Sequence, residues 1–105
     1  MRANILEHKG DFIGYESITV NTAIGFTVTT LVTSDVPKQH AVTAFCRLET
    51  AQIRYRLDGT DPTTTEGILL EVGETLIVIG HMNLMRFRAI KTGTTNGVLK
   101  VQYGY

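Results

Sequence analysis

Residues 53–63 read IRYRLDGTDPT, and this stretch decides the class of fold. Its first half alternates, with Ile53, Tyr55 and Leu57 separated by arginines. Such a period of two is typical of a β-strand with one face in the core and one face in water. The flanking polar residues Gln52 and Asp58 extend the alternation, so the sequence predicts a strand over residues 52–58.

The second half of the stretch, DGTDPT, consists of turn-forming residues. Gly59 takes a positive φ without steric cost, and Asp58 and Asp61 are suited to Asx turns, in which a carboxylate accepts from a nearby backbone N–H. Pro62 fixes its own φ and restricts Asp61 to extended geometry. A calcium site would need six to eight oxygen ligands, and this loop lacks the spacing of a calcium loop. We therefore predict a structural turn that binds no ion and no substrate.

The rest of the chain supports an all-β protein. Threonine, valine and isoleucine are frequent, helix formers do not gather at helical spacing, and turn signals come close together. The expected strands cover residues 12–20 (with a possible break at Gly14), 24–31, 41–48, 52–58, 67–72, 75–79, 84–91 and 98–103. They predict a β-sandwich of seven or eight strands, immunoglobulin-like or jelly-roll-like, with a small barrel as the alternative. We expect residues 1–11 to form an N-terminal arm and residues 12–105 to form a single domain.

Composition limits the possible functions. The chain has 105 residues, with ten basic and ten acidic side chains, which argues against broad electrostatic capture of nucleic acid or of an anionic membrane. The single cysteine, Cys46, lies in an apolar run and is expected to be buried. No apolar stretch approaches the roughly 20 residues of a membrane span, and the N-terminus does not resemble a signal peptide. We expect a protein made in the cytoplasm.

No catalytic set is evident in the sequence. The three histidines, His8, His40 and His81, are far apart, and neither Ser17 nor Ser34 lies in a nucleophile elbow. The acidic residues of the middle segment are expected on a turn and on strand ends: Asp58, Asp61, Glu66, Glu71 and Glu74. The sequence thus predicts no enzyme, no metal site and no cofactor.

Four arginines form the candidate interface. Arg54 and Arg56 face outward on one expected strand, and Arg86 and Arg88 do so on another. If the two strands are neighbours, these side chains share one surface, where arginine would pair with carboxylates of a partner. The alternative is a solvated sheet face with local ion pairs. Residues 24–34 carry no charge, and such a strand at a sheet edge would be either covered or used in assembly.

The stretch at 53–63 is similar to the C-terminal β-sandwich module of chitobiase and β-hexosaminidase type proteins, with its pattern I-x-Y-T-x-D-G-x-x-P-T. The matching residues are Ile53, Tyr55, Asp58, Gly59, Pro62 and Thr63. Residues 86–89, RFRA, resemble the following x-K-A-x-A strand only loosely. This resemblance implies a carbohydrate-binding module. Tryptophan is absent, so Tyr15, Tyr55, Tyr103 and Tyr105 would have to stack on the sugars.

A longer resemblance covers roughly residues 40–105. Small structural proteins of tailed bacteriophages often read hydrophobic-R-(Y/W)-R-x-D-G-T-x-P-T, then G-x-x-L-x-x-G-(D/E)-x-L, L-x-x-(L/F) and L-x-V-x-Y. Residues 53–63, 67–76, 84–87 and 99–103 follow these patterns in this order. The resemblance implies a virion protein, assembled in the host cytoplasm: a capsid decoration (cement) protein, or a head–tail or tail component. Its implied partners are the major capsid protein, other virion proteins and further copies of itself. It assigns no binding residues.

Overall fold

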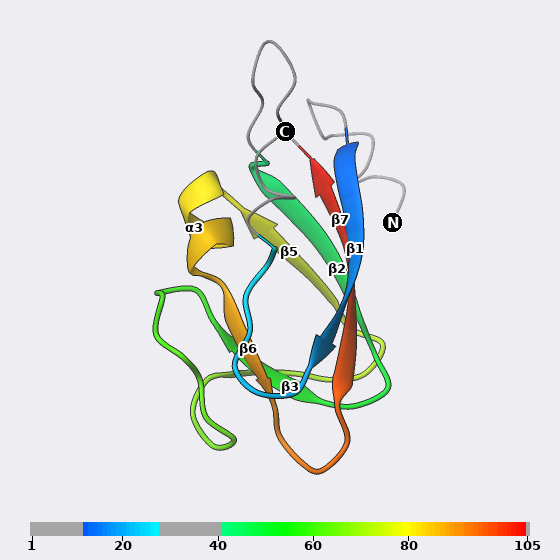
Figure 1. Cartoon of the computed structure of the whole chain (residues 1–105), viewed down its shortest axis with the longest axis vertical. Helices are drawn as coiled ribbons and strands as arrows, with labels where there is room; N and C mark the ends of the chain where they lie inside the picture. Colours follow the sequence, from blue (N-terminus) through cyan, green and yellow to red (C-terminus); the bar gives the residue numbers. More distant parts are fainter. Residues whose placement is uncertain (1–11, 28–40, 105) are drawn as a thin grey trace.

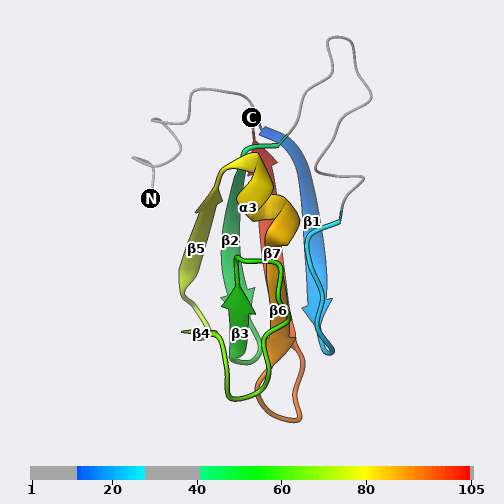
Figure 2. The ribbon, with the colours of Figure 1, turned by 90° about the vertical axis from the view of Figure 1, so that its left-hand side faces the viewer.

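The computed structural model describes residues 12–27 and 41–104, which form two antiparallel sheets (Figures 1 and 2). The elements in chain order are β1 (Phe12–Val20), β2 (Thr43–Glu49), β3 (Ile53–Arg56), β4 (Ile68–Leu70), β5 (Thr75–Ile79), α3 (His81–Arg86), β6 (Arg88–Lys91) and β7 (Gly97–Gly104). One sheet has the order β1-β7-β2-β5 and the other the order β4-β3-β6. The prediction of a small all-β sandwich is confirmed.

The core lies between the two sheets. In β2 and β7 every second side chain is buried, for example Cys46 and Leu48 in β2 and Leu99 and Val101 in β7. From the smaller sheet, Ile53 is fully buried as its alternation predicts. Burial of such side chains is the main stabilising term of a domain of this size.

An aromatic cluster joins the sheets at one end of the core. Phe26 and Phe87 stack with ring centroids 4.1 Å apart, and Tyr103 meets Phe26 edge-on at 5.5 Å. Tyr55 stacks on Phe87 at 5.9 Å, so β3 contributes to the same cluster. These arrangements are the favoured geometries of aromatic pairs.

The strand expected over residues 24–31 is wrong in its described part. Ile24 makes one isolated bridge to Ala89, and residues 25–27 belong to no strand. On a strand Ile24 and Phe26 would lie on one face, but Ile24 is exposed whereas Phe26 is buried. Phe26 is buried because it packs against Phe87 and Tyr103, so exposed and buried side chains do not alternate here as they would in a strand. Residues 28–31 lie outside the described residues, as does the expected arm at 1–11.

The strand expected over residues 84–91 is also partly wrong. Residues His81–Arg86 form the short helix α3, and only Arg88–Lys91 form a strand. Leu84 and Phe87 are both buried at a spacing of three, which suits a helical turn rather than a strand. The N–H of Leu84 bonds to the carbonyl of Gly80 at 3.0 Å and closes the first turn. Phe87 then takes an extended conformation and starts the path into β6.

The other predicted strands match the observed ones to within two residues at each end, and the strand over residues 75–79 has its predicted bounds. β1 matches its predicted range, and its register shifts between Phe12 and Gly14, where the break was expected. Gly73 lies in the turn between β4 and β5 and has a φ of 88°. That turn does not close a hairpin, because β4 and β5 belong to different sheets. It carries the chain from one layer of the sandwich to the other.

Candidate functional site

The DGTDPT loop begins with a clamp between two neighbouring side chains. Arg56 donates from Nε to Asp58 Oδ1 at 3.1 Å and from Nη2 to Asp58 Oδ2 at 2.5 Å. Asp58 Oδ1 also accepts from the N–H of Thr60 at 3.2 Å, which is the predicted Asx turn. The hydrogen bond from Arg56 and the N–H of Thr60 hold the pKa of Asp58 below its ordinary value. Both carboxylate oxygens of Asp58 therefore already accept hydrogen bonds from within the loop and its preceding strand.

Gly59 forms the corner of the loop. Its φ is 84°, which confirms the predicted left-handed conformation. Its N–H bonds to the carbonyl of Arg86 at 3.2 Å and fixes the loop to the end of α3. Pro62, two residues after Thr60, is buried.

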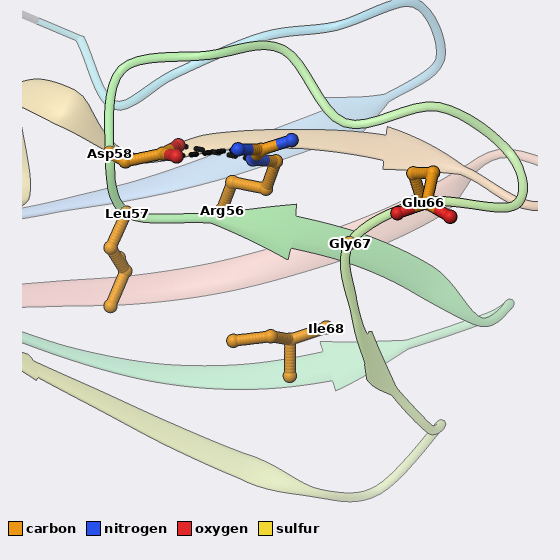
Figure 3. Close-up of a pocket in the computed structure, with 6 residues that line it drawn as sticks. All are labelled: Arg56, Leu57, Asp58, Glu66, Gly67 and Ile68. Carbon is orange, nitrogen blue, oxygen red and sulfur yellow. Dashed lines mark hydrogen bonds and ion pairs between the residues drawn. The ribbon is translucent and has the colours of Figure 1, made fainter.

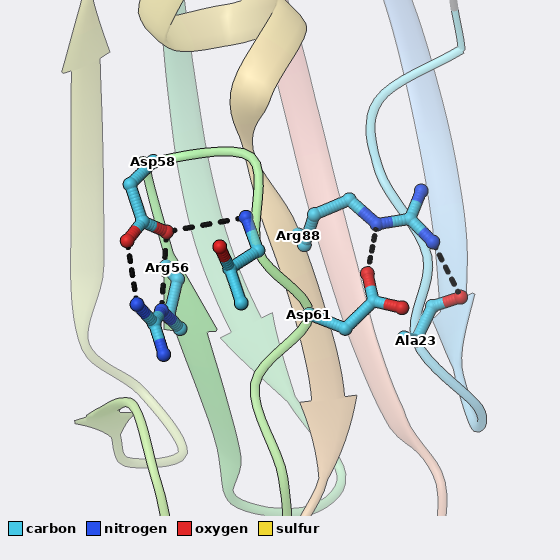
Figure 4. A network of polar contacts seen from close by, with 6 residues as sticks. Ala23, Arg56, Asp58, Asp61 and Arg88 are labelled. Carbon is cyan, nitrogen blue, oxygen red and sulfur yellow. Dashed lines mark hydrogen bonds and ion pairs between the residues drawn. The ribbon is translucent and has the colours of Figure 1, made fainter.

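Asp61 has a different role from the one predicted. Instead of an Asx turn, its Oδ1 accepts from Arg88 Nε at 2.7 Å, across a separation of 27 residues. Arg88 Nη2 also donates to the carbonyl of Ala23 at 3.2 Å (Figure 4). This network ties three segments together: the loop, β6 and the chain after β1.

Arg54 holds the second half of the loop. Its Nε donates to the carbonyl of Thr64 at 3.2 Å, and its Nη1 donates to that of Gly67 at 2.9 Å. Thr63 closes a turn of its own, since its Oγ1 accepts from the N–H of Glu66 at 2.9 Å. The loop is thus organised from within by backbone groups and by β3 side chains.

The candidate arginine interface is only partly assembled. β3 and β6 are neighbours, and Arg56 and Arg88 are register partners. Arg86 lies on α3 and not on a strand as expected, so the four arginines do not share one sheet face. Within the described part of the chain, the guanidinium groups of Arg54, Arg56 and Arg88 have local acceptors, whereas exposed Arg86 has none.

An open hollow lies beside this loop (Figure 3). It has a volume of about 510 Å³ and is lined by Arg56, Leu57, Asp58, Glu66, Gly67 and Ile68. Of its three charged side chains, Arg56 and Asp58 pair with each other, and Glu66 is the third. Its Gly67 has a φ of 133°, and a Cβ there would come within 3.0 Å of Pro62 Cβ and 3.2 Å of Arg54 Cβ, so the wall is closely packed.

A second polar cluster was not foreseen from the sequence. Glu16 on β1 accepts from the Thr27 N–H at 3.1 Å, from Thr27 Oγ1 at 2.5 Å and from the hydroxyl of Tyr103. Burial and this bond to Glu16 raise the pKa of Tyr103. The alternation of β1, which turns Glu16 to the same side as Ile18, is the only local signal that could have indicated it.

Two further residues, Cys46 and His81, lie among backbone and core groups of the domain. Cys46 is fully buried as expected, and burial raises the pKa of its thiol to about 12. His81 Nδ1 lies 2.8 Å from the carbonyl of Ala41. Over residues 12–27 and 41–104, no three His, Cys, Asp or Glu side chains group in a way that could hold a metal ion. In the same ranges no helix has the length and apolar character needed to cross a membrane. His8, His40, Ser34 and Tyr105 lie outside the described residues.

Comparisons with protein-family models, with curated proteins and with solved structures found no significant match.

Proposed function

We propose that this chain is a non-enzymatic structural protein of a tailed-bacteriophage virion, a capsid decoration protein that binds the major capsid lattice. The observation that carries the proposal is the ordered series of motifs between residues 53 and 103, which resembles small phage structural proteins. In the fold, these motifs supply core positions of both sheets. Examples are Ile53, Leu70, Phe87, Leu99 and Val101.

The polar groups of the best-matching motif also support a structural role. Asp58 pairs with Arg56, Asp61 pairs with Arg88, and Arg54 binds loop carbonyls. These interactions satisfy the charged groups of residues 53–63 and of Arg88, which a substrate or an ion would otherwise engage. Such a domain would act through its outer surface, and repetition on a lattice would multiply weak contacts by avidity.

The carbohydrate-binding alternative has less support. Sugar rings stack on exposed aromatic faces, but Tyr103 is fully buried and Tyr55 stacks on Phe87. Tyr15 is the one strongly exposed tyrosine among the described residues. A glycan array probed with the purified chain tests this alternative, and binding above background would support it.

Quantitative mass spectrometry of purified virions tests the virion role. The particles should come from the phage that encodes the chain, with heads and tails separated before analysis. A decoration protein should be in the head fraction, at a copy number comparable to that of the capsid lattice. A few copies per particle would indicate a head–tail connector or tail component, and absence from intact particles would overturn the virion proposal.

Rebinding to stripped heads tests the contact with the lattice directly. Heads depleted of the chain should recover it when recombinant protein is added. The expected role of residues 1–11 as an arm over an adjacent subunit predicts weaker rebinding of a chain that lacks them. Equal rebinding would assign the contact to residues 12–105.

A further inference from the structure

β5 lies at one edge of the four-stranded sheet, beside β2 (Figure 2). Its sequence, TLIVI, contains no charged residue and no proline. Natural sheets usually protect an edge with charges, proline, a bulge or a covering segment, because an open edge pairs with other strands. No described strand pairs with the outer side of β5.

The backbone of β5 presents hydrogen-bonding groups on that outer side. The N–H of Leu48 bonds to Glu74 O at 3.2 Å, and the N–H of Gly80 bonds to Val42 O at 2.6 Å. Bonded pairs alternate in an antiparallel ladder, so Leu76 and Val78 direct their N–H and C=O groups toward β2. Thr75, Ile77 and Ile79 therefore direct theirs toward the open side. Asn83 Nδ2 reaches Ile79 O at 2.8 Å, which agrees with this direction.

The side chains of Ile77 and Ile79, together with Phe45 of β2, form an apolar row on the outer face of the sheet. Ile77 is 37% exposed and Ile79 is 68% exposed. Phe45 on β2 is the register partner of Ile77 and is half-buried. Exposed Met82, at the start of α3, follows Ile79 in the chain. The strand therefore offers both backbone groups and apolar surface to a partner.

The opposite edge of this sheet, β1, has two protective features. Its register is interrupted by an irregularity between Phe12 and Gly14, and Glu16 turns a carboxylate inward to Tyr103 and Thr27. Bulges and inward-pointing charges are both devices that discourage edge pairing. β5 has neither.

The edges of the smaller sheet are protected as well. Ile24 exchanges two backbone bonds with Ala89 of β6, at 2.9 and 2.8 Å, and Lys91 N bonds to Asn21 O at 3.3 Å. β4 has only three residues. Among the strands described, β5 is thus the edge of five residues with neither a bulge nor an inward-pointing charge, although the side chain of Asn83 occupies the carbonyl of Ile79 on its outer side.

We propose that β5 pairs antiparallel with β5 of a second copy of the chain, around a two-fold axis at Ile77. In this register each Ile77 donates to and accepts from Ile77 of the second copy. Each Ile79 N–H donates to Thr75 O of the second copy. The pairing joins the two four-stranded sheets into one continuous sheet.

The charge distribution favours a second copy in this orientation. Residues 75–80 carry no charge, and Glu74 directly precedes them. An antiparallel pair places the two Glu74 side chains at opposite ends, whereas a parallel pair would set them side by side and make them repel. A strand of the same neutral, β-branched composition also matches the apolar row face for face. A two-fold axis then covers the β5 edge of both copies with one contact and leaves β1, with its protective features, at both edges of the joined sheet.

The predicted contact is small. Standard interfaces use about 20–30 residues on each side, so an edge pairing of five residues should give a weak dimer, with a Kd on the order of 10 μM to 1 mM. The inference does not depend on a role in the virion, since it concerns the isolated chain.

Analytical ultracentrifugation of the full chain from about 10 μM to 1 mM tests the pairing. We expect a reversible monomer–dimer equilibrium. Ile77→Lys should weaken association at least tenfold, because lysine at the axis sets two like charges together. Tyr15→Lys, on the outer face of β1, is the matched control and should associate like the wild type. Thermal melts should show that both variants remain folded.

Amide hydrogen exchange measured by NMR provides a second readout. The amides of Ile77 and Ile79 should become more protected as concentration rises, whereas those of Leu76 and Val78 should be protected throughout by β2. A monomer at every concentration, growth beyond a dimer, or association unaffected by Ile77→Lys would each overturn the proposal. So would concentration-independent protection of Ile77, because it would mean that the same molecule covers the edge.

Discussion

Arg88 and Asp61 join the loop after β3 to the neighbouring strand β6 through one charged hydrogen bond, from Nε to Oδ1 at 2.7 Å. Their side chains are 35% and 58% exposed. Ion pairs with this degree of exposure typically contribute about 0.2–1 kcal/mol. The pair therefore orients the loop more than it stabilises the domain.

Asp61→Asn should lower the free energy of unfolding by less than about 1 kcal/mol, because asparagine keeps an oxygen acceptor for Arg88. The Asx turn predicted for Asp61 from the sequence would lead to the same small effect, because asparagine also accepts in such a turn. Urea denaturation of Asp61→Asn, Arg88→Ala and the double variant gives the coupling energy between the two positions. A coupling near zero would contradict the pairing, and a melting temperature lowered by chelator would contradict the assignment of the loop as a turn.

Gly59→Val should destabilise the domain by about 1–3 kcal/mol, the usual cost of a strained backbone position. The cost comes from the φ of 84°, since a Cβ at Gly59 would meet only Arg86 Cγ, at an ordinary 3.8 Å. Gly93→Val is the matched control, because a Cβ there meets no atom within 4 Å and no positive φ is present. Thermal melts compare the two variants. Equal losses would argue against backbone strain as the cause.

Arg54 and Arg86 should differ in their effect on stability. Arg54→Ala removes the donor to Thr64 O and Gly67 O, and hydrogen bonds to charged groups contribute about 1.5–3 kcal/mol. Arg86→Ala should change stability by no more than about 0.5 kcal/mol, since the side chain is exposed. Chemical denaturation measures both values.

Arg86→Ala is consequently the cleaner probe of the candidate arginine interface. If the surface carrying Arg54, Arg56, Arg86 and Arg88 meets a partner, this variant should rebind stripped heads more weakly while remaining fully folded. Arg47→Ala, an exposed arginine on β2, controls for the loss of one positive charge. Equal rebinding of Arg86→Ala and the wild type would assign Arg86 to a solvated surface that meets no partner.

Cys46 should be inert toward thiol reagents in the folded protein. Its pKa of about 12 keeps the thiol protonated at pH 8, and the side chain is fully buried. Labelling with Ellman's reagent should proceed only after denaturant is added. Rapid labelling of the native protein would contradict the burial of Cys46.

The same pKa predicts a loss of stability in alkali. The ordinary value is 9.0 and the folded value is about 12, so the folded state binds the proton more tightly. The stabilising contribution is complete below about pH 9 and falls by about 1.4 kcal/mol per pH unit above it. Cys46→Ala should reduce this slope, whereas Tyr103 should keep contributing because its pKa is raised as well. If the free energy of unfolding of Cys46→Ala fell with pH as steeply as that of the wild type, the raised pKa of Cys46 would be contradicted.

Local sequence determined the features that depend on neighbours in the chain. The alternation of Ile53 and Tyr55 predicted β3, and the turn chemistry of Asp58 and Gly59 predicted the conformation of the loop. The bounds of β1 were also predictable, because period-two patterns and turn residues act over a few residues.

Tertiary structure decided the features that depend on distant residues. Leu84 lies in a helix and Phe26 lies outside any strand, contrary to the local pattern, because both side chains are buried against other elements. Asp61 accepts a hydrogen bond from Arg88, 27 residues away in the sequence, and Glu16 accepts one from Tyr103, 87 residues away. Nothing in the sequence near either acidic residue specifies these partners. The exposed edge of β5 has the same origin: its sequence predicts a strand, but only the order of the described strands in the sheet leaves one side of β5 without a neighbour among them.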